Sequence, residues 1–478
     1  MITIHFNNYE SLYTQIYNCF VNEIRQKNIK SGERLPPQRV LSQHLGVSLN
    51  TVKSAYNQLL DEGYIVSKQR SGFFVDKFLF EDFRYNYETE QFGKNHKETA
   101  VKKSTLCIKD SLCSENFAYE DRIKYDFSYA SIDKSKIPTS IFKKCVNEAM
   151  ETIATHPVKS AKDGLWSLRD QIAKYLAHRR GVITPAKNVI ITSGYIENLF
   201  LLMNLIDNCY FAMEDPGYSK TLDIFANSSK KIIAIPIDKY GFSVKDLEVT
   251  DANTAIVTPN HQFPTGIITG LRRRQRILGW ANRRSGRYIV EDDYNGDFKY
   301  SGNPIPALKS LDMNDKVILS GSFSQSIGSF LGVSYLVLPD SLIEKKDSLN
   351  MPFSEVSLLQ QYILEKFLSS GAFEKHINRM NTHYKKKRNI MLKCLKKRKG
   401  IEISGADAGL HVVIRLDDDC WDCRDFKKKM KENRIFVQPI QDYSVNKNSK
   451  NDVILGFGGI EPEKIEPALD LFFEAIKK

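Results

Sequence analysis

Two apolar stretches of this 478-residue chain end in side chains that can do chemistry. The first, Ile289–Tyr294, ends in carboxylates and a phenol, and the second ends in the hydroxyls of Ser322 and Ser324 and the amide of Gln325. Short apolar runs of this kind are typical of buried strands. We therefore expect the two strand ends to form the floor of one pocket. Because an amide is not nucleophilic, Gln325 gives this floor no covalent chemistry.

A second set of polar residues lies near the N-terminus. Short polar side chains at a helix start can reach the edges of DNA bases, and flanking cations can neutralise phosphates. The candidate DNA contacts are Arg34, Arg39, Ser48, Asn50, Thr51, Lys53, Lys68, Arg70 and Gly72. The alternative is an ordinary three-helix domain with a solvated polar face.

The elements that must position these DNA contacts can be predicted from spacing. Helical periodicity over Ser11–Gln26, a short helix over Gln38–Leu45 that ends at Gly46, and an N-cap at Ser48 predict a helix-turn-helix. Two short strand candidates follow, and the basic stretch Lys68–Gly72 between them predicts a wing.

The composition sets bounds on the protein. A hydrophobic fraction of 42% supports a sizeable core, and a net charge of +12 favours polyanionic partners. The length allows two or three domains at about 100–200 residues each. We expect no membrane span and no signal peptide, because the chain has no long apolar run and its start lacks a basic region before an apolar one. Eight scattered cysteines indicate a reducing, cytoplasmic compartment.

The chain divides into three segments by composition. We expect a DNA-binding unit over 9–77, a charged linker without apolar periodicity over 78–124, and a long segment over 125–478. In the last segment strand and helix candidates alternate, which predicts a mostly parallel sheet covered by helices. From about Ile401 the pattern is that of a small α+β subdomain. The expected fold class is therefore α/β behind a winged helix-turn-helix.

The N-terminal motifs resemble the GntR-type winged helix-turn-helix of bacterial regulators. The resemblance is carried by the stretches Arg34–Leu41, Leu45–Val52 and Glu62–Ile65. Leu49 departs from the family pattern, which very often has arginine at this position. We therefore expect an altered operator preference.

The long segment resembles fold-type I aminotransferases. The motifs G-L-W-S-L-R, T-S-G, E-D-P-G-Y, T-P-N-H-Q-F-P-T-G, E-D-D-Y and G-L-H begin at Gly164, Thr192, Glu214, Thr258, Glu291 and Gly409. Behind a GntR-type reader, this arrangement is identified as that of the MocR subfamily of regulators. The resemblance implies a pyridoxal-phosphate pocket, and it implies a homodimer because fold-type I sites form at a subunit interface.

The resemblance also assigns roles to residues. Asp292 would pair with the cofactor's pyridinium nitrogen, Tyr294 would hydrogen-bond the ring hydroxyl, and Tyr218 would stack on the ring. Ser193 and Gly194 open a helix whose free N–H groups would hold the phosphate. The remaining candidates for cofactor contacts are Ser322, Ser324 and Gln325. The alternative for Asp292 is a carboxylate that caps a strand end or forms a salt bridge.

Several positions depart from the family pattern. Gln325 stands where the lysine that carries the cofactor is expected, so transaldimination is lost. Gly332 replaces an arginine for the phosphate, and Gly459 replaces the arginine that clamps a substrate carboxylate. A partner-subunit tyrosine expected near Gly164 is also replaced. Lys159 or Lys162 could supply the missing positive charge for the phosphate. Lys447 or Lys450 could supply it for the substrate carboxylate.

Two weaker signals remain. Cys420 and Cys423 form a lone C-x-x-C, for which incidental cysteines are favoured over a redox or metal role, so we expect no metal site. The basic runs Lys385–Arg388 and Lys396–Lys399 favour a solvated helix face over an auxiliary contact with the DNA backbone.

These expectations favour a cytoplasmic, homodimeric regulator that binds specific sequences of double-stranded DNA. Its aminotransferase-like domain would sense an unidentified small molecule or mediate dimerisation, without transaminase activity. One alternative is an active or weakly active pyridoxal-phosphate-dependent aminotransferase with a tethered DNA-binding domain. Another is that the pocket holds pyridoxal phosphate, or its aldimine with an amino compound, non-covalently as an effector. The sequence does not identify the regulated genes, the sign of regulation or the effector.

Overall fold

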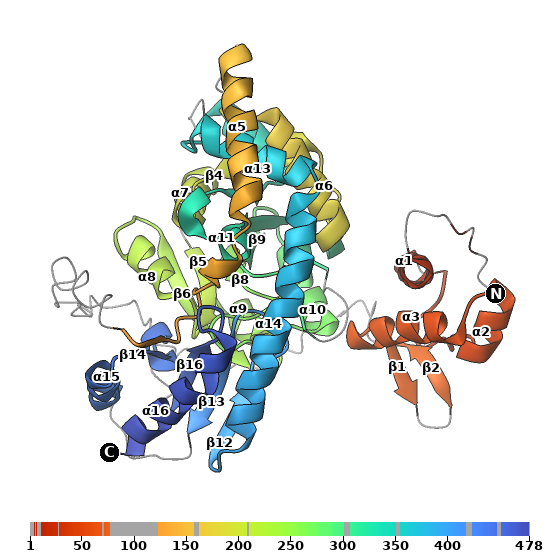
Figure 1. Ribbon diagram of the computed structural model, residues 1–478. Coiled ribbons are helices and arrows are strands. Elements are labelled where there is room, and N and C mark those ends of the chain that lie inside the picture. The colour runs from red at the N-terminus through yellow and green to blue at the C-terminus, as the bar shows by residue number, and fades with distance from the viewer. Residues whose placement is uncertain are drawn as a thin grey trace, which may run out of the picture.

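The computed structural model describes residues 4, 6, 11–26, 28–68, 71–76, 123–156, 162–207, 210–300, 306–349, 354–416, 423–446 and 451–477. It contains an N-terminal helical unit, a large domain around a central sheet, and a small C-terminal domain (Figure 1). The expected linker over 78–124 lies almost entirely outside the described residues, as do Arg70, Lys159, Cys420, Lys447 and Lys450. The expected fold class is confirmed.

The N-terminal unit is a winged helix-turn-helix. It comprises α1 (Leu12–Arg25), α2 (Gln38–Leu45), α3 (Leu49–Asp61) and a hairpin of β1 (Ile65–Lys68) and β2 (Gly72–Val75). Gly46 ends α2 in the left-handed conformation with a φ of 65°, and Ser48 caps α3 by accepting the Thr51 N–H at 3.1 Å. The apolar faces of the three helices share one core. The polar start of α3 therefore faces outward.

An eight-stranded sheet forms the centre of the large domain, in the order β4-β11-β10-β9-β8-β5-β6-β7. The strands are β4 (Val189–Thr192), β5 (Tyr210–Asp215), β6 (Lys231–Asp238), β7 (Gly241–Phe242), β8 (Thr254–Val257), β9 (Tyr288–Asp293), β10 (Val317–Ser322) and β11 (Ser334–Val337). Neighbours from β10 to β6 pair in parallel, and β11 is antiparallel to both β10 and β4. The carboxyl ends of β4, β5, β8, β9 and β10 therefore meet at one edge, which is where open α/β sheets bind ligands.

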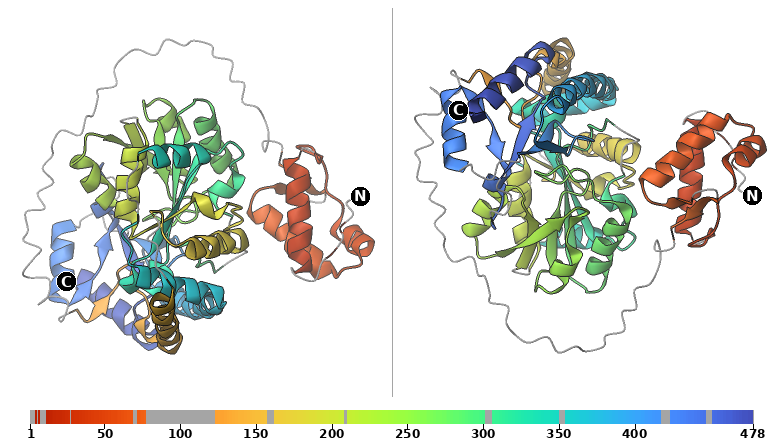
Figure 2. Two further views of the ribbon diagram at one scale, coloured as in Figure 1. Left: turned by 90° about the horizontal axis from the view of Figure 1, so that it is seen from above. Right: turned by 90° about the horizontal axis from the view of Figure 1, so that it is seen from below.

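Helices cover both faces of this sheet (Figure 2). They are α5 (Thr139–Thr155), α6 (Trp166–Arg180), α7 (Tyr195–Leu205), α8 (Ser219–Ala226), α9 (Val244–Glu248), α10 (Leu271–Asn282), α11 (Ser324–Ile327), α12 (Asp340–Ser348), α13 (Leu358–Ser369) and α14 (Ala372–Lys396). Along β9, Ile289 packs in the apolar cluster under α10, whereas Val290 packs in the cluster under α7. Both faces of the strand are therefore buried, as a continuous apolar run predicts. Within the described part of the chain, no helix is long and apolar enough to cross a membrane.

The small domain is an antiparallel sheet in the order β12-β13-β16-β15. Its elements are β12 (Ile401–Ser404), β13 (His411–Leu416), α15 (Cys423–Glu432), β14 (Ile435–Phe436), β15 (Gln438–Pro439), β16 (Asp452–Gly456) and α16 (Ile465–Lys477). The strand β3 (Tyr125–Asp126) pairs in parallel with β14, so the segment that follows the linker region closes onto this domain. Short 3-10 helices span Lys134–Lys136, Ala186–Asn188, Leu308–Leu311, Ser329–Leu331, Ile440–Tyr443 and Pro462–Lys464.

The winged helix-turn-helix contacts the large domain at the start of α10 (Figure 1). Leu271 is buried in the same apolar cluster as the residues of α1 and α3. Gly63, just after α3, has its Cβ position 3.6 Å from the Leu271 Cβ. Arg272 pairs with Asp76 at 3.5 Å. The C-terminal end of α3 therefore packs against the domain that carries the expected pocket.

Candidate functional site

Three consecutive carboxylates end β9, and only the middle one has no partner among the described residues. Glu291 accepts the backbone N–H groups of Leu308 and Lys309 at 2.7 and 2.8 Å. Asp293 pairs with Arg180 at 2.7 Å. Asp292 points to the other face, is half-buried, and has neither a hydrogen bond nor an ion pair there. Burial raises the pKa of Asp292 to about 8, with Asp293, Glu214 and Glu291 adding to the rise.

A cluster of packed aromatic rings lies near the end of β9. Phe263 is at their centre, with its ring centroid 4.5 Å from Tyr129, 4.9 Å from Tyr443, 5.8 Å from Tyr218 and 5.9 Å from Tyr294. Burial raises the pKa of Tyr294, and Asp292, two residues earlier in the chain, adds to the rise. The structure thus brings Asp292, Tyr294 and Tyr218 together at one strand edge.

Tyr294 has a partner that the sequence did not point to. Its hydroxyl lies 3.0 Å from Nδ1 of His261, and Nε2 of the same ring lies 3.2 Å from the Gly405 carbonyl oxygen. A carbonyl oxygen can only accept, so Nε2 carries the proton. Burial lowers the pKa of His261 to about 4, so the ring is neutral and Nδ1 accepts from Tyr294. The only signal in the sequence was the position of His261 inside the T-P-N-H-Q-F-P-T-G motif.

The second strand end presents hydroxyls and an amide. The Ser322 hydroxyl accepts the Ser324 N–H at 3.1 Å and lies 3.0 Å from the Ser324 hydroxyl. The two serine side chains are therefore hydrogen-bonded to each other. Gln325 follows in α11. Its Oε1 is buried and has no hydrogen-bond partner in the described chain. The amide therefore presents a hydrogen-bond acceptor that no residue in the described part of the chain satisfies.

The start of α7, expected to hold a phosphate, already holds a carboxylate. Glu197 Oε2 accepts the Ser193 N–H at 2.5 Å and the Ser193 hydroxyl at 2.6 Å. Gly194 is the N-cap, so Glu197 is the third residue of the helix, and its side chain reaches back to Ser193, the residue before the N-cap. A negative side chain in the first turn is favoured by the helix dipole. Glu197 was not among the residues expected at this site, although Glu in the first turn of a helix is a recognised capping signal.

The glycine at 332 does not offer a place for the expected arginine. Gly332 has a φ of 57°, in the left-handed region that side chains rarely adopt. Lys162, a candidate substitute cation, is exposed.

A loop packs against the two glycines where the resemblance places the far end of the pocket. A Cβ on Gly459 would lie 2.7 Å from the Ser131 Cβ, and a Cβ on Gly458 would lie 2.1 Å from the Ser131 carbonyl oxygen. The Ser131 hydroxyl donates to Asp126 at 2.5 Å, which anchors the loop. The space into which an arginine at 459 would start is therefore occupied by backbone and by Ser131.

One residue of the basic run Lys385–Arg388 corrects the expectation of a solvated face. Lys385 and Lys386 are exposed, but Lys387 is fully buried. Its ammonium donates to Asp133 and to the Gly458 carbonyl, both at 2.8 Å. Lys387 faces inward because the helical period places it on the same side of α14 as the buried Tyr384 and Met391.

The expected DNA contacts lie on the outer surface of the winged helix-turn-helix. The exposed side chains are Arg34, Arg39, Ser48, Asn50, Lys53 and Lys68, whereas Thr51 and Gly72 are half-buried. Lys68 lies over the Phe74 ring at 4.6 Å, on the wing. Ser48 and Thr51 are joined by a 2.8 Å hydrogen bond, so both support the helix start.

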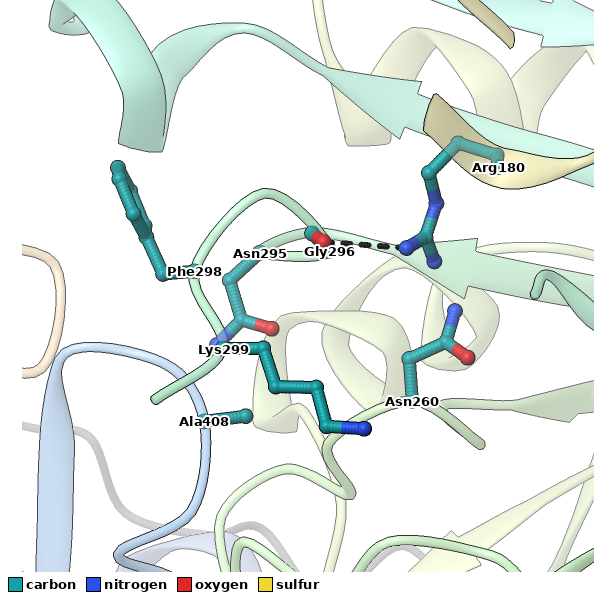
Figure 3. Close-up of a pocket in the computed structure, with 7 residues that line it drawn as sticks. All are labelled: Arg180, Asn260, Asn295, Gly296, Phe298, Lys299 and Ala408. Atoms are coloured by element: carbon teal, nitrogen blue, oxygen red, sulfur yellow. Dashed lines mark hydrogen bonds between the residues drawn. The ribbon is translucent and has the colours of Figure 1, made fainter. Parts of the chain in front are cut away.

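A further pocket lies beside Asp293, lined by Arg180, Asn260, Asn295, Gly296, Phe298, Lys299 and Ala408 (Figure 3). Arg180 donates to the Gly296 carbonyl at 3.0 Å, and Lys299 extends across the pocket toward Asn260. Burial lowers the pKa of Lys299, and the nearby charges of Glu62 and Asp61 oppose this. Glu62 is the C-cap residue of α3, so Lys299 lies close to the C-terminal end of that helix.

Family models match both parts of the chain. The model of aminotransferase class I and II matches residues 142–471, and the model of bacterial regulatory proteins of the gntR family matches residues 12–75. The chain belongs to the aminotransferase class I and II family. The N-terminal match adds a DNA-binding domain of the gntR family to it.

Regulators with the same two-part composition are similar over almost the whole chain. The uncharacterized HTH-type transcriptional regulator YdeL of Bacillus subtilis is 32% identical over 463 residues, which cover 96% of this chain and 95% of YdeL. The probable rhizopine catabolism regulatory protein MocR of Rhizobium meliloti is 26% identical, with 96% and 92% covered. The pyridoxine biosynthesis regulator PdxR of Corynebacterium glutamicum is 26% identical, with 98% and 96% covered. The chain is thus an HTH-type transcriptional regulator with an aminotransferase-like domain.

A solved aminotransferase shows the fold of the second domain. The Pyrococcus horikoshii kynurenine aminotransferase, solved with PMP, superposes with a TM-score of 0.69 at 24% identity and covers 79% of this chain and 96% of its own. Proteins of this fold typically bind pyridoxal phosphate. The fit of this chain to that cofactor depends on the residues described above at the end of β9, in α11 and at the start of α7.

Proposed function

We propose that this regulator binds specific DNA sequences and that its aminotransferase-like pocket senses a small molecule without transaminating it. The observation that carries the proposal is Gln325, at the start of α11, where the resemblance places the lysine of aminotransferases. A Schiff base needs a primary amine, and an amide nitrogen is not a nucleophile. The pocket can therefore bind and orient a ligand but offers no covalent partner at this position.

The residues present fit only the ring end of pyridoxal phosphate. Asp292, Tyr294 and Tyr218 lie together as the resemblance implies. At the phosphate end, Glu197 holds the Ser193 N–H, and Gly332 supplies no charge. At the substrate end, Ser131 lies against Gly459. Since the phosphate would meet a carboxylate rather than a cation, we derive no role for this cofactor. The residues at the phosphate end therefore disfavour non-covalent binding of pyridoxal phosphate.

The DNA-binding surface that we propose consists of the start of α3 and the wing. Asn50 and Lys53 are exposed on the outward face of the helix, and Ser48 fixes the helix start. Short polar side chains at that point can reach base edges, while Arg34, Arg39, Lys68 and Arg70 supply the phosphate contacts. The family relationship implies the DNA binding itself, and these residues are our assignment of it.

We propose that a second copy of the chain covers an apolar surface of the large domain. The exposed side chains are Met150 on α5, Trp166 on α6, Ile196 and Phe200 on α7, and Phe330, with exposures between 45% and 60%. The helix α5 lies at the top of Figure 1, with α6 and α7 below it on either side. Apolar side chains exposed together mark interaction sites more often than those that occur singly. A dimer would also present two DNA readers, which suits paired half-sites.

The contact between Gly63 and Leu271 offers a route from the pocket to the DNA reader. Leu271 begins α10, and α10 packs against β9, whose end carries Asp292. A ligand that changes the position of the end of β9 would therefore act on the segment that holds α3. Such coupling requires that the ligand bind the two arrangements with different affinity.

The proposal is tested by reduction with borohydride in the presence of pyridoxal phosphate. We expect intact-mass spectrometry of the full-length protein to show no adduct after reduction, with the same result for Gln325→Ala. A kynurenine or aspartate aminotransferase treated in parallel should gain one pyridoxyl group. A stoichiometric adduct on this chain, located to one lysine by peptide mapping, would favour the alternative of an active aminotransferase with a tethered DNA-binding domain.

A further inference from the structure

The outward stripe of α3 consists of uncharged polar side chains. Asn50, Ser54 and Asn57 lie at positions i, i+4 and i+7 of the helix, which places them on one face. All three are exposed, and none of them has a hydrogen bond or an ion pair through its side chain among the described residues. The opposite face packs in the core of the winged helix-turn-helix through Val52, Ala55, Tyr56 and Leu59. The packing of the core therefore fixes which side chains of α3 face outward.

The amides of this stripe remain available, whereas the hydroxyls at the helix start are engaged. Ser48 accepts the Thr51 N–H, and the two hydroxyls lie 2.8 Å apart. These two side chains therefore support the start of the helix. A side-chain amide offers one carbonyl acceptor and two N–H donors. In the described part of the chain, the amides of Asn50 and Asn57 make no use of these groups, so they can bind a partner.

The cations of the winged helix-turn-helix lie beside the stripe rather than on it. The charged residues of α3 are Lys53, which flanks the stripe, and Asp61 in its last turn. Arg34 packs beside the wing, with its Nε 3.4 Å from the Cβ position of Gly72. Lys68 lies on the wing, at the end of β1. Flanking cations can bind phosphates, which leaves the uncharged stripe to face the base edges.

The length and composition of the stripe indicate what it can read. A helix rises about 1.5 Å per residue, so Asn50 and Asn57 lie about 10 Å apart along the axis, which matches about three base-pair steps of 3.4 Å. In the major groove an asparagine amide pairs with adenine, because its N–H donates to N7 and its carbonyl accepts from the N6 amino group. The commonest reader of guanine is arginine, and α3 contains no arginine.

We propose that α3 reads two A·T base pairs through Asn50 and Asn57, about three steps apart, with Ser54 facing the bases between them. Asp61 continues the stripe but carries a charge that repels phosphates, so the contact ends before the last turn. This inference rests on the proposed function, which assigns Asn50 to base contacts. It adds Ser54 and Asn57 as specificity-determining residues and names the class of operator: half-sites with adenines at two set positions of the major groove.

The test begins with the selection of binding sites by the full-length protein from duplexes with a randomised central segment. At about 0.15 M salt, we expect the enriched half-sites to fix A·T at two positions about three base pairs apart. Asn50→Ala and Asn57→Ala should each lower the affinity for the selected site by at least about fivefold. Each variant should also lose the preference at one of the two positions, and the position should differ between the variants.

Two exchanges test the contact of Asn57 at the level of single atoms. In 7-deazaadenine the N7 acceptor is missing. At the position that depends on Asn57, this base should weaken binding of the wild type by about fivefold or more and change binding of Asn57→Ala by less than about twofold. Asn57→Arg should change the preference at the same position from adenine to guanine, because arginine pairs bidentately with guanine. A residue with a merely structural role would not exchange one base for another.

The matched control is Asn22, an exposed asparagine on α1 of the same winged helix-turn-helix. Asn22→Ala and Asn22→Arg should leave the selected sequence unchanged, and circular dichroism confirms that each variant is folded. The inference is overturned if Asn57→Ala selects the same sequence as the wild type, or if the Asn22 variants alter the sequence as the Asn57 variants do.

The selection by the wild type separates this inference from the proposed function. If the protein enriches no sequence at all, sequence-specific binding fails, and the assignment of readers fails with it. If the protein enriches a defined sequence that lacks the two A·T pairs, only the assignment of Asn50, Ser54 and Asn57 to adenine-containing half-sites fails.

Discussion

Lys387 and Asp133 form a buried ion pair, with Nζ 2.8 Å from the carboxylate, directly behind the glycine run at the end of the pocket. The same ammonium donates to the Gly458 carbonyl at 2.8 Å, so α14 holds the backbone of that run. The loop that ends at Ser131 lies against Gly458 and Gly459. We propose that this packing forms a wall at the end of the pocket where, by the resemblance, an aminotransferase would clamp a carboxylate.

Removing one partner of this pair should destabilise the protein. Lys387→Met leaves Asp133 with only His383 and Ser135 as donors, so we expect a loss of about 3 kcal/mol in the free energy of unfolding. Lys386→Met, at the exposed neighbouring position, should change it by less than about 0.5 kcal/mol. Urea denaturation followed by tryptophan fluorescence measures both. Equal values for the two variants would show that the pair does not support the wall.

A methyl group at residue 459 should have a measurable cost. Gly459→Ala places a Cβ 2.7 Å from the Ser131 Cβ, and we expect about 1–3 kcal/mol of destabilisation from overpacking. The control is Gly279→Ala, because Gly279 lies within α10 and has nothing within 4 Å of its Cβ position. Alanine there should be neutral or stabilising by up to about 1 kcal/mol. If Gly459→Ala were as well tolerated as Gly279→Ala, the wall would be open.

The pH dependence of stability should reveal the strain at Asp292. Burial raises the pKa of Asp292 to about 8 in the folded protein, whereas the pKa of an aspartate in the unfolded chain is about 3.9. The folded state therefore retains a proton that the unfolded state has lost between these values, and stability falls as pH rises through this window.

Asp292→Asn should remove that loss. Since solvent screens a half-buried group, we expect a gain of about 1–2 kcal/mol over wild type at pH 9 and none at pH 4. Thermal unfolding at the two pH values measures the difference. Asp170→Asn, at an exposed pair with Lys174, should show no such pH dependence. A gain of the same size at both pH values would mean that the carboxylate is not strained by burial.

DNA binding should separate the roles of two neighbouring residues of α3. Asn50→Ala should weaken binding to the operator by about 1–3 kcal/mol and leave binding to random DNA unchanged. The reason is that a contact with a base edge contributes only to recognition of the DNA sequence. Lys53→Ala should weaken binding to the operator and to random DNA alike, because a phosphate contact does not depend on the DNA sequence. It should also reduce the slope of log affinity against log salt concentration by about 1. Lys174→Ala, on α6, is the control. Fluorescence anisotropy at several salt concentrations measures all three, and a uniform loss for both variants would contradict the assignment.

The sequence predicted the parts of the fold that depend on local pattern. The cap at Ser48, the end of α2 at Gly46 and the apolar run of β9 follow from residue type and periodicity, and the structure has all three. The grouping of Asp292, Tyr218 and Tyr294 followed from the resemblance together with the rule that parallel strands end at one edge.

What the sequence did not show were contacts between segments distant in the chain. His261 meets Tyr294 only after β8 and β9 pair, and the 128–131 loop reaches Gly459 across more than half of the chain. In the sequence Lys387 is one of a run of basic residues. Its burial could not be predicted from that run, because it depends on the packing of α14 against the 131–133 segment. Glu197 was the exception, since its capping contact is local.

The most direct test of the central claim is the preference of the full-length protein for its own control region. We would compare, by gel shift at about 0.15 M salt, the DNA upstream of its gene and of the adjacent genes with random duplexes of equal length and base composition. We predict a specific affinity at least about 10³-fold above that for the random duplexes. Equal affinity for all duplexes would contradict the claim that this chain is a sequence-specific regulator.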